Sequence, residues 1–189
     1  MTLFRTVGPA VEPVPLAQAK AHLRVTHESE DDLLEGLIRA AREAVEDQTG
    51  LALIEQKWRL VLDRWPRGGV VKLLRYPVSD VDALTVYGSD GVPVVIEPER
   101  YGVDRVSRPA RVQAEMPAVN ARALNGIEID FTAGYGTDGT AVPEGLKLAL
   151  LVLVGHWFEM RGSFGPDEQP VSYPAQFERL IAPFRLRRL

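Results

Sequence analysis

The first 50 residues hold two stretches in which apolar side chains recur with the period of an α-helix. In the first stretch, Pro15 suits an opening turn, and Leu16, Ala19 and Leu23 share one face. In the second, over residues 29–50, apolar residues form one stripe and charged residues cover the rest of the surface. The stripe consists of Leu33, Leu34, Leu37, Ile38, Ala41 and Val45, and the charged positions are Glu35, Arg39, Arg42, Glu43 and Glu46.

Both ends of this second helix carry capping signals. Ser29 is a preferred N-cap residue, and the acidic residues 30–32 fall in the first turn, where the helix dipole favours negative charge. Gly50 suits a left-handed C-cap. Burying the stripe contributes about 2 kcal/mol per large side chain, whereas ordering the backbone costs at least about 1 kcal/mol per residue. The helix therefore needs a packing partner.

After Glu55 the apolar period changes to two, because Trp58, Leu60 and Leu62 alternate with more polar neighbours, as in a half-buried strand. Residues 89–91, Ser-Asp-Gly, are a hairpin signal between two later strand candidates. The further candidates are 70–74, 81–87, 92–96, 101–103, 110–113 and 127–131. The middle of the chain is therefore predicted to be an antiparallel β region.

A third helix is predicted to begin at Pro143, with Glu144 in its first turn. Residues 146–154 leave almost no polar face, so this helix should be buried and should pack against the second. After a loop at 162–172, a fourth helix is expected. We predict an α+β fold: a small bundle of about four helices with an antiparallel β region inserted between helices two and three.

We expect a single domain covering residues 1–189, and residues 1–13, which contain Gly8, Pro9 and Pro13 and no apolar period, should form an extended arm. The expected parts are that arm, helices one and two over 14–50, the β region over 55–131, helices three and four over 143–183, and a tail over 184–189.

Composition narrows the function classes. The net charge is −4, which argues against free nucleic acid as the main partner, because phosphate binding needs concentrated Lys and Arg. The chain has no cysteine and therefore no disulfide, thiol nucleophile or thiolate metal site. The N-terminus does not resemble a signal peptide, and the longest apolar run, 148–154, is far below the roughly 20 residues that cross a bilayer. We expect synthesis in the cytoplasm and no membrane insertion.

Candidate chemical sites are weak. Residues 27–32, His-Glu-Ser-Glu-Asp-Asp, lack calcium-loop or paired-histidine spacing and fit an acidic first turn better than a metal site. The glycine-rich stretch 132–139 lacks the spacing of a phosphate loop and fits a tight turn. Asp63 and Asp130 remain possible acid/base partners, because sequence does not give their distance. We expect no enzyme activity, no metal and no cofactor.

The end of the chain differs from an ordinary solvated terminus because cations and apolar side chains alternate along it. Apolar anchors can bury surface on a partner while guanidinium groups pair with carboxylates. The predicted partner-binding residues are Phe184, Arg185, Leu186, Arg187, Arg188 and Leu189.

From Val14 to Leu189 the chain resembles the head-tail connector proteins, also called adaptor or head-completion proteins, of long-tailed phages, prophages and gene transfer agents. No single motif is diagnostic, but the order and spacing of several are specific. They are 15–25 (PLAQAKAHLRV), 31–34 (DDLL), 40–50 (AAREAVEDQTG), 53–60 (LIEQKWRL), 63–66 (DRWP), 131–136 (FTAGYG), 142–143 (VP) and 155–159 (GHWFE).

The resemblance implies a structural protein of the particle neck that forms a ring, commonly of twelve copies, beneath the portal of the capsid. Helices would form the ring scaffold, DNA would pass through the channel without specific binding, and later neck or tail-completion proteins would assemble on the ring. The same resemblance implies that 184–189 reaches the portal protein. Two alternatives stay open: a small carboxylate-dependent hydrolase and a nucleic-acid-binding regulator that uses the basic tail.

Overall fold

The computed structural model describes residues 1–115, 121–160 and 173–186, and it divides the chain into two compact units. Met1–Pro9 and Glu55–Tyr135 make up the first, which we call the β unit, and Ala10–Ile54 and Gly136–Leu189 make up the second, the helical unit. The fold class is therefore α+β with four α-helices and antiparallel sheets in the described residues, as predicted. Along the chain, β2 to β8 lie between α2 and α3, whereas β1 precedes α1.

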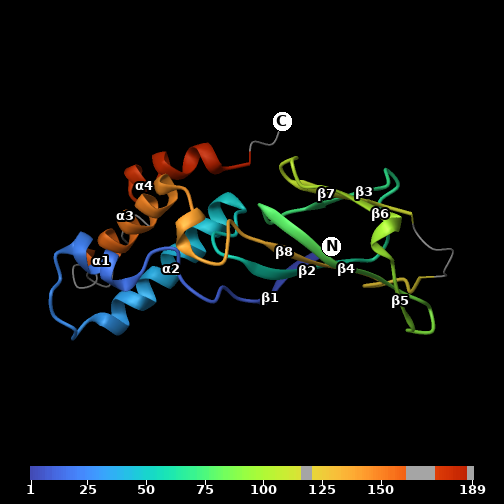
Figure 1. The fold of residues 1–189 in the computed structure, drawn as a ribbon, viewed down its shortest axis with the longest axis horizontal. Helices are drawn as coiled ribbons and strands as arrows, with labels where there is room; N and C mark the ends of the chain where they lie inside the picture. Colours follow the sequence, from blue (N-terminus) through green and yellow to red (C-terminus); the bar gives the residue numbers. More distant parts are fainter. Residues whose placement is uncertain (116–120, 161–172, 187–189) are drawn as a thin grey trace, which may run out of the picture. The chain divides into compact units, whose positions relative to one another are not determined.

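The larger sheet of the β unit has five strands, all antiparallel to their neighbours (Figure 1). Apolar residues of the two central strands supply its core, because Leu60, Ile129 and Phe131 are fully buried. Each predicted strand that falls in this sheet is confirmed. In spatial order the strands are β1 (Thr2–Val7), β2 (Gln56–Leu62), β8 (Ile127–Ala133), β4 (Val78–Tyr87) and β5 (Pro93–Val95).

The smaller sheet has three strands and also matches the predicted positions. Its order is β3 (Val70–Leu73), β7 (Ala110–Ala114) and β6 (Tyr101–Asp104), with a short 3-10 helix, η1 (Pro98–Arg100), before β6. Tyr101 of β6 donates from its hydroxyl to the carbonyl of Val81 on β4 over 3.4 Å, which links the two sheets. Arg105, directly after β6, forms an exposed ion pair of 2.7 Å with Asp80 on β4.

The expectation of an extended N-terminal arm over 1–13 is wrong for its first half, because Thr2–Val7 forms strand β1 on β2. The segment lacks an apolar period because β1 is an edge strand whose residues are almost all exposed. Its content of Thr, Val, Leu and Phe suits a strand, and β2 offers it an unpaired edge. A register shift between Arg5 and Val7 marks an irregularity in the pairing.

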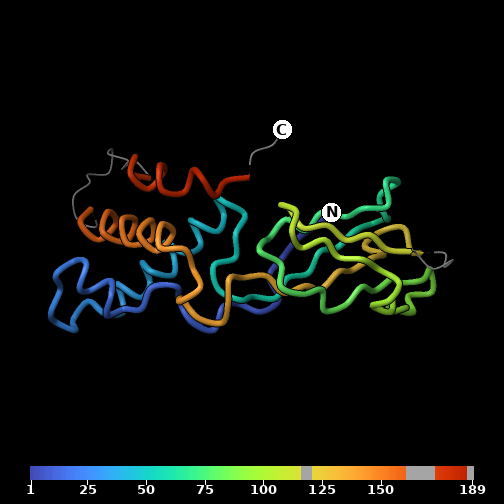
Figure 2. Tube along the Cα trace, turned by 45° about the horizontal axis from the view of Figure 1, so that its top comes forward, coloured from blue at the N-terminus to red at the C-terminus, as the bar shows by residue number. Residues whose placement is uncertain are grey.

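In its described residues the helical unit has four α-helices, and α3 is the central one, packing against the other three (Figure 2). Helix α3 is buried along Leu146, Leu150 and Leu153, which confirms it as the partner of α2. The bounds are α1 (Leu16–Leu23), α2 (Asp31–Thr49), α3 (Glu144–Met160) and α4 (Ala175–Ile181), with short 3-10 helices η2 (Gly139–Ala141) and η3 (Ala182–Phe184).

The ends of α2 are partly as predicted. Gly50 is the C-cap, with a left-handed φ of 77°, as expected. Ser29 is not the N-cap: Glu30 holds that position without a side-chain cap, and the Ser29 hydroxyl lies 2.9 Å from Nδ1 of His27. The helix thus begins one residue later, and Asp31 and Asp32 still provide acidic groups in its first turn.

The buried stripe of α2 differs from the predicted one at both margins. Leu34, Ile38, Ala41 and Val45 are buried as expected, but Leu33 is 41% exposed. Two residues that the pattern assigned to the charged surface lie inside the helical unit instead: Arg42 and Glu46 are 2% and 3% exposed. The apolar period alone could not place them, because their burial depends on charged partners.

Arg42 and Glu46 belong to an ionic cluster that also includes Glu12. The Arg42 guanidinium donates to Glu12 over 2.8 Å and to Glu46 over 2.9 Å. The second carboxylate oxygen of Glu46 accepts the backbone N–H of Leu53 over 2.9 Å. Burial lowers the pKa of Arg42, but Glu46 and Glu12 outweigh that effect and the pKa is raised. The cluster therefore fastens the segments before and after α2 to that helix.

Candidate docking site

The predicted docking residues begin where α4 ends. Helix α4 buries Phe177 and Ile181, and the Tyr173 ring stacks on Phe177 with centroids 5.1 Å apart. The chain then continues through η3 to Phe184, Arg185 and Leu186, all of which are half-buried. Arg187, Arg188 and Leu189 lie outside the described residues.

Arg185 is held by the helical unit rather than projecting alone. Its Nη2 atom forms an ion pair of 2.6 Å with Glu178 of α4 and donates a hydrogen bond of 2.8 Å to Gln48 of α2. Phe184 lies close to the first turn of α3, because a Cβ atom added to Gly145 would lie 3.8 Å from its ring. Phe184 and Arg185 therefore attach the start of the tail to three helices, a role that the sequence did not reveal.

The acidic segment before α2 is engaged in local contacts. Lys20 of α1 pairs with Asp31 over 2.6 Å, and His27 lies 3.7 Å from Glu30. In the described parts of the chain, no group of three or more His, Cys, Asp or Glu side chains is placed to hold a metal ion. The Lys20–Asp31 pair instead links α1 to the first turn of α2.

Asp63 and Asp130 are not brought together as an acid/base pair. Asp130 accepts two hydrogen bonds, of 2.7 and 2.8 Å, from Arg59, its cross-strand neighbour on β2. Asp63 follows Arg59, the neighbour of Asp130, by four residues, a separation of roughly 13 Å at the rise of a strand. The Asp63 carboxylate accepts the backbone N–H of Asn125. Each carboxylate therefore stabilises the β unit.

The glycine-rich stretch 132–139 begins in the last residues of β8, continues as bends and enters η2, so the tight turn that was expected is a longer irregular connection. Gly134 has a φ of 153° and donates its N–H to the carbonyl of Pro77 over 2.8 Å. The Asp138 carboxylate accepts hydrogen bonds from the hydroxyl and N–H of Thr140, which lower its pKa. A side chain at Gly139 would clash with the backbone carbonyl of Pro13, so this position requires glycine for a close approach.

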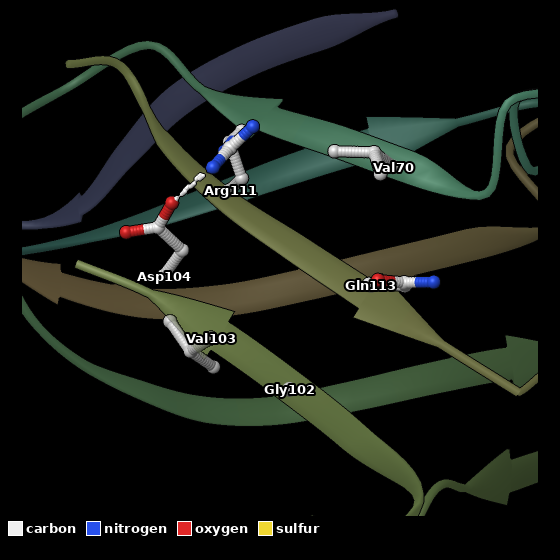
Figure 3. A pocket seen from close by; sticks show the side chains of 6 residues that line it. All are labelled: Val70, Gly102, Val103, Asp104, Arg111 and Gln113. Carbon is white, nitrogen blue, oxygen red and sulfur yellow. Dashed lines mark hydrogen bonds and ion pairs between the residues drawn. The ribbon is translucent and has the colours of Figure 1, made fainter. Parts of the chain in front are cut away.

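A shallow hollow of about 360 Å³ on the smaller sheet was not predicted (Figure 3). Gln113 of β7 lies between Val70 of β3 and Gly102 of β6, and Asp104 and Arg111 form an ion pair beside them (Figure 3). Hydrogen bonds from Ser107 and then from Arg111 hold the pKa of Asp104 well below its usual range. Since Asp104 also accepts the backbone N–H groups of Val106 and Ser107, it stabilises the β6–β7 connection.

Within residues 1–115, 121–160 and 173–186, no helix combines the length and the apolar character that a membrane span requires. Together these contacts give the charged groups discussed above partners within their own unit.

Part of the chain is similar to a family of phage head-tail connector proteins. Residues 14–75 match the family model of the phage gp6-like head-tail connector protein. This match covers α1, α2, β2 and β3. Among curated proteins, none matches the chain.

Solved structures match over the whole chain. One relative is a chain in the neck of an empty gene transfer agent particle computed with C6 symmetry, with a TM-score of 0.82 and 28% identity. A second, in the virion of the native particle, has a TM-score of 0.81 and 29% identity, and a third, in the native neck computed with C12 symmetry, has 0.79 and 28%. Each alignment covers 100% of this chain and 97% of the other. The comparisons therefore confirm the resemblance to head-tail connector proteins that the sequence indicated.

Proposed function

We propose that this chain is a structural protein of the particle neck, an adaptor that joins the capsid portal to the tail and allows DNA to pass. The observation that carries the proposal is the match of the entire chain to chains of gene transfer agent necks. A match restricted to one unit would support a shared domain only. Here both units, and 97% of each relative, are aligned, which supports a shared role as well as a shared fold.

The adaptor works as a ring of identical copies. The related necks were computed with C6 and C12 symmetry, which supports a cyclic oligomer in the particle. We propose twelve copies, with the β unit and the helical unit of each chain acting as one connector domain. The net charge of −4 suits a channel through which DNA slides, since strong phosphate binding would retain it.

Portal protein is the proposed partner of the C-terminal tail, and a downstream neck or tail-completion protein is the proposed partner of the ring. Arg185 already pairs with Glu178, so Arg187 and Arg188 are the arginines that we propose for the partner. Phe184 and Arg185 would set where the tail leaves the helices. Carboxylates on a protein are the expected partners of these arginines, because bidentate pairing suits guanidinium groups.

The enzyme alternative has lost its specific support. The two carboxylates that suggested a hydrolase are separated along the strand and each has a structural partner. The comparisons point to structural neck proteins rather than to enzymes. A regulator that binds nucleic acid through its basic tail gains no support from these relatives either.

Imaging the neck tests the ring. Particles carrying an affinity tag on this chain should yield necks in which the tagged protein forms one closed ring of twelve copies next to the portal. Electron microscopy of the purified necks, with mass measurement of the released ring, gives the copy number. A chain found as a single copy, or on the tail away from the portal, would contradict the proposal.

A further inference from the structure

The five-stranded sheet has two open edges. Among residues 1–115, 121–160 and 173–186, β1 pairs with β2 alone and β5 with β4 alone. Each edge therefore presents backbone N–H and C=O groups on one side, which another strand can pair with. On β5, the bonds between residues 84 and 96 and between 88 and 92 imply that Pro93 and Val95 turn their backbone groups outward. Pro93 has no backbone N–H, so the outward side of β5 offers a partner strand the carbonyls of Pro93 and Val95 and the N–H of Val95.

Both edges expose apolar side chains on the same face of the sheet. Phe4 lies opposite Arg59, and Arg59 lies opposite Asp130 of β8, so Phe4 shares a face with these two polar residues. Val95 lies opposite Thr85, which lies opposite Glu128 on that same face of β8. Phe4 is 44% exposed and Val95 is 60% exposed.

This arrangement matters because a sheet that continues from one copy into the next keeps its faces aligned. If the β1 edge of one copy meets the β5 edge of another, Phe4 and Val95 become neighbours on one face. Apolar side chains that lie beside each other on neighbouring strands stabilise a sheet because they bury surface against one another. Val7, 52% exposed and opposite Lys57 on the same face, extends the apolar strip of β1.

The two edges also differ in charge. Residues 1–9 contain Arg5 and no acidic residue, and exposed Lys57 lies beside them on β2. The β5 edge is acidic, with three exposed carboxylates and one cation between residues 88 and 100. The carboxylates are Asp90, Glu97 and Glu99, and the cation is Arg100. A basic edge and an acidic edge favour contact between unlike edges over contact between like ones.

Strand direction is compatible with a ring. Every neighbouring pair in the sheet is antiparallel, so β1 and β5, four strands apart, point the same way. A contact between two different surfaces of identical chains is head-to-tail, and such contacts generate closed rings when the rotation closes. The β1 and β5 edges would then pair as parallel strands.

We propose that the β1 edge of each copy pairs with the β5 edge of the next copy, so that the β units form a subunit interface of the ring. The occupant of each edge is thus a second copy of this chain. This inference rests on the proposed ring and specifies one of its contacts.

Thiol cross-linking tests the contact, because the chain contains no cysteine. The double variant Phe4→Cys/Val95→Cys, treated with a short thiol-specific cross-linker in necks isolated from particles, should give a ladder of covalent dimers, trimers and larger multimers. The control Phe4→Cys/Val106→Cys carries the same number of thiols. Val106 is 93% exposed on the β6–β7 connection of the same unit.

We expect at least roughly tenfold more cross-linked chain in the first variant than in the control, because thiols on paired edges have a high effective concentration. If necks contain the ring but the two variants cross-link equally, the β1–β5 contact is wrong while the neck function stands. If the chain is missing from necks altogether, the proposed function fails, and the contact fails with it.

Discussion

Changing Arg187 and Arg188 to glutamate is expected to give a folded protein with which filled heads acquire tails at least about tenfold less often. Interface arginines commonly contribute about 2 kcal/mol or more each, and 1.4 kcal/mol already changes an equilibrium tenfold. Glutamate would also repel the carboxylates that the arginines are proposed to meet. The fraction of tailed particles, counted by electron microscopy, measures the effect.

Two further variants separate docking from folding. Arg187→Lys/Arg188→Lys keeps the charge and should retain most of the tail attachment, although lysine loses bidentate pairing. Deletion of residues 184–189 also removes Phe184 and Arg185, so it should lower stability as well as attachment. If heads carrying the glutamate variant acquire particle tails at the normal level, the C-terminal segment 184–189 is not a docking element.

Replacing Glu46 with alanine is expected to destabilise the helical unit by about 3–5 kcal/mol, the usual cost of removing one partner from a buried ion pair. The change removes a hydrogen bond acceptor from Arg42 and from the backbone N–H of Leu53 at once. The side chains of Arg42 and Glu46 are only 3% and 4% exposed, so the substitution leaves a buried guanidinium for which Glu12 is the remaining close carboxylate partner among the described residues. Urea unfolding followed by far-UV circular dichroism gives the change in stability.

Glu43→Ala is the matched control. Glu43 belongs to the same helix and also pairs with Arg42, over 3.4 Å, but its side chain is 52% exposed. Exposed ion pairs contribute about 0–1 kcal/mol. Equal effects of the two substitutions would mean that the cluster does not act as a buried ionic link.

Strand and helix positions were largely predictable because apolar periodicity is a local property. The alternation at Trp58, Leu60 and Leu62 and the apolar run of α3 each identified their element correctly. Strand β1 was not predicted, because an edge strand that is exposed on both faces has no apolar period. Pairing with β2, some 55 residues away along the chain, is what makes it a strand.

Buried charges could not be predicted for a related reason. Arg42 and Glu46 have the spacing of a solvent-exposed pair on a helix, and only Glu12 and the Leu53 N–H, from other segments, make their burial favourable. In the candidate site, the alternation of cations and apolar residues marked the tail, but it gave no sign that Arg185 would be held by Glu178 and Gln48. Contacts between distant segments decide such cases.

The central claim, that this chain joins heads to tails, is tested most directly by withholding it. Particles assembled without the chain should accumulate as filled heads without tails, and adding purified protein back to those heads together with tails should restore tailed particles. Electron microscopy counts both populations. Tailed, functional particles formed at the normal yield in the absence of the chain would contradict the account.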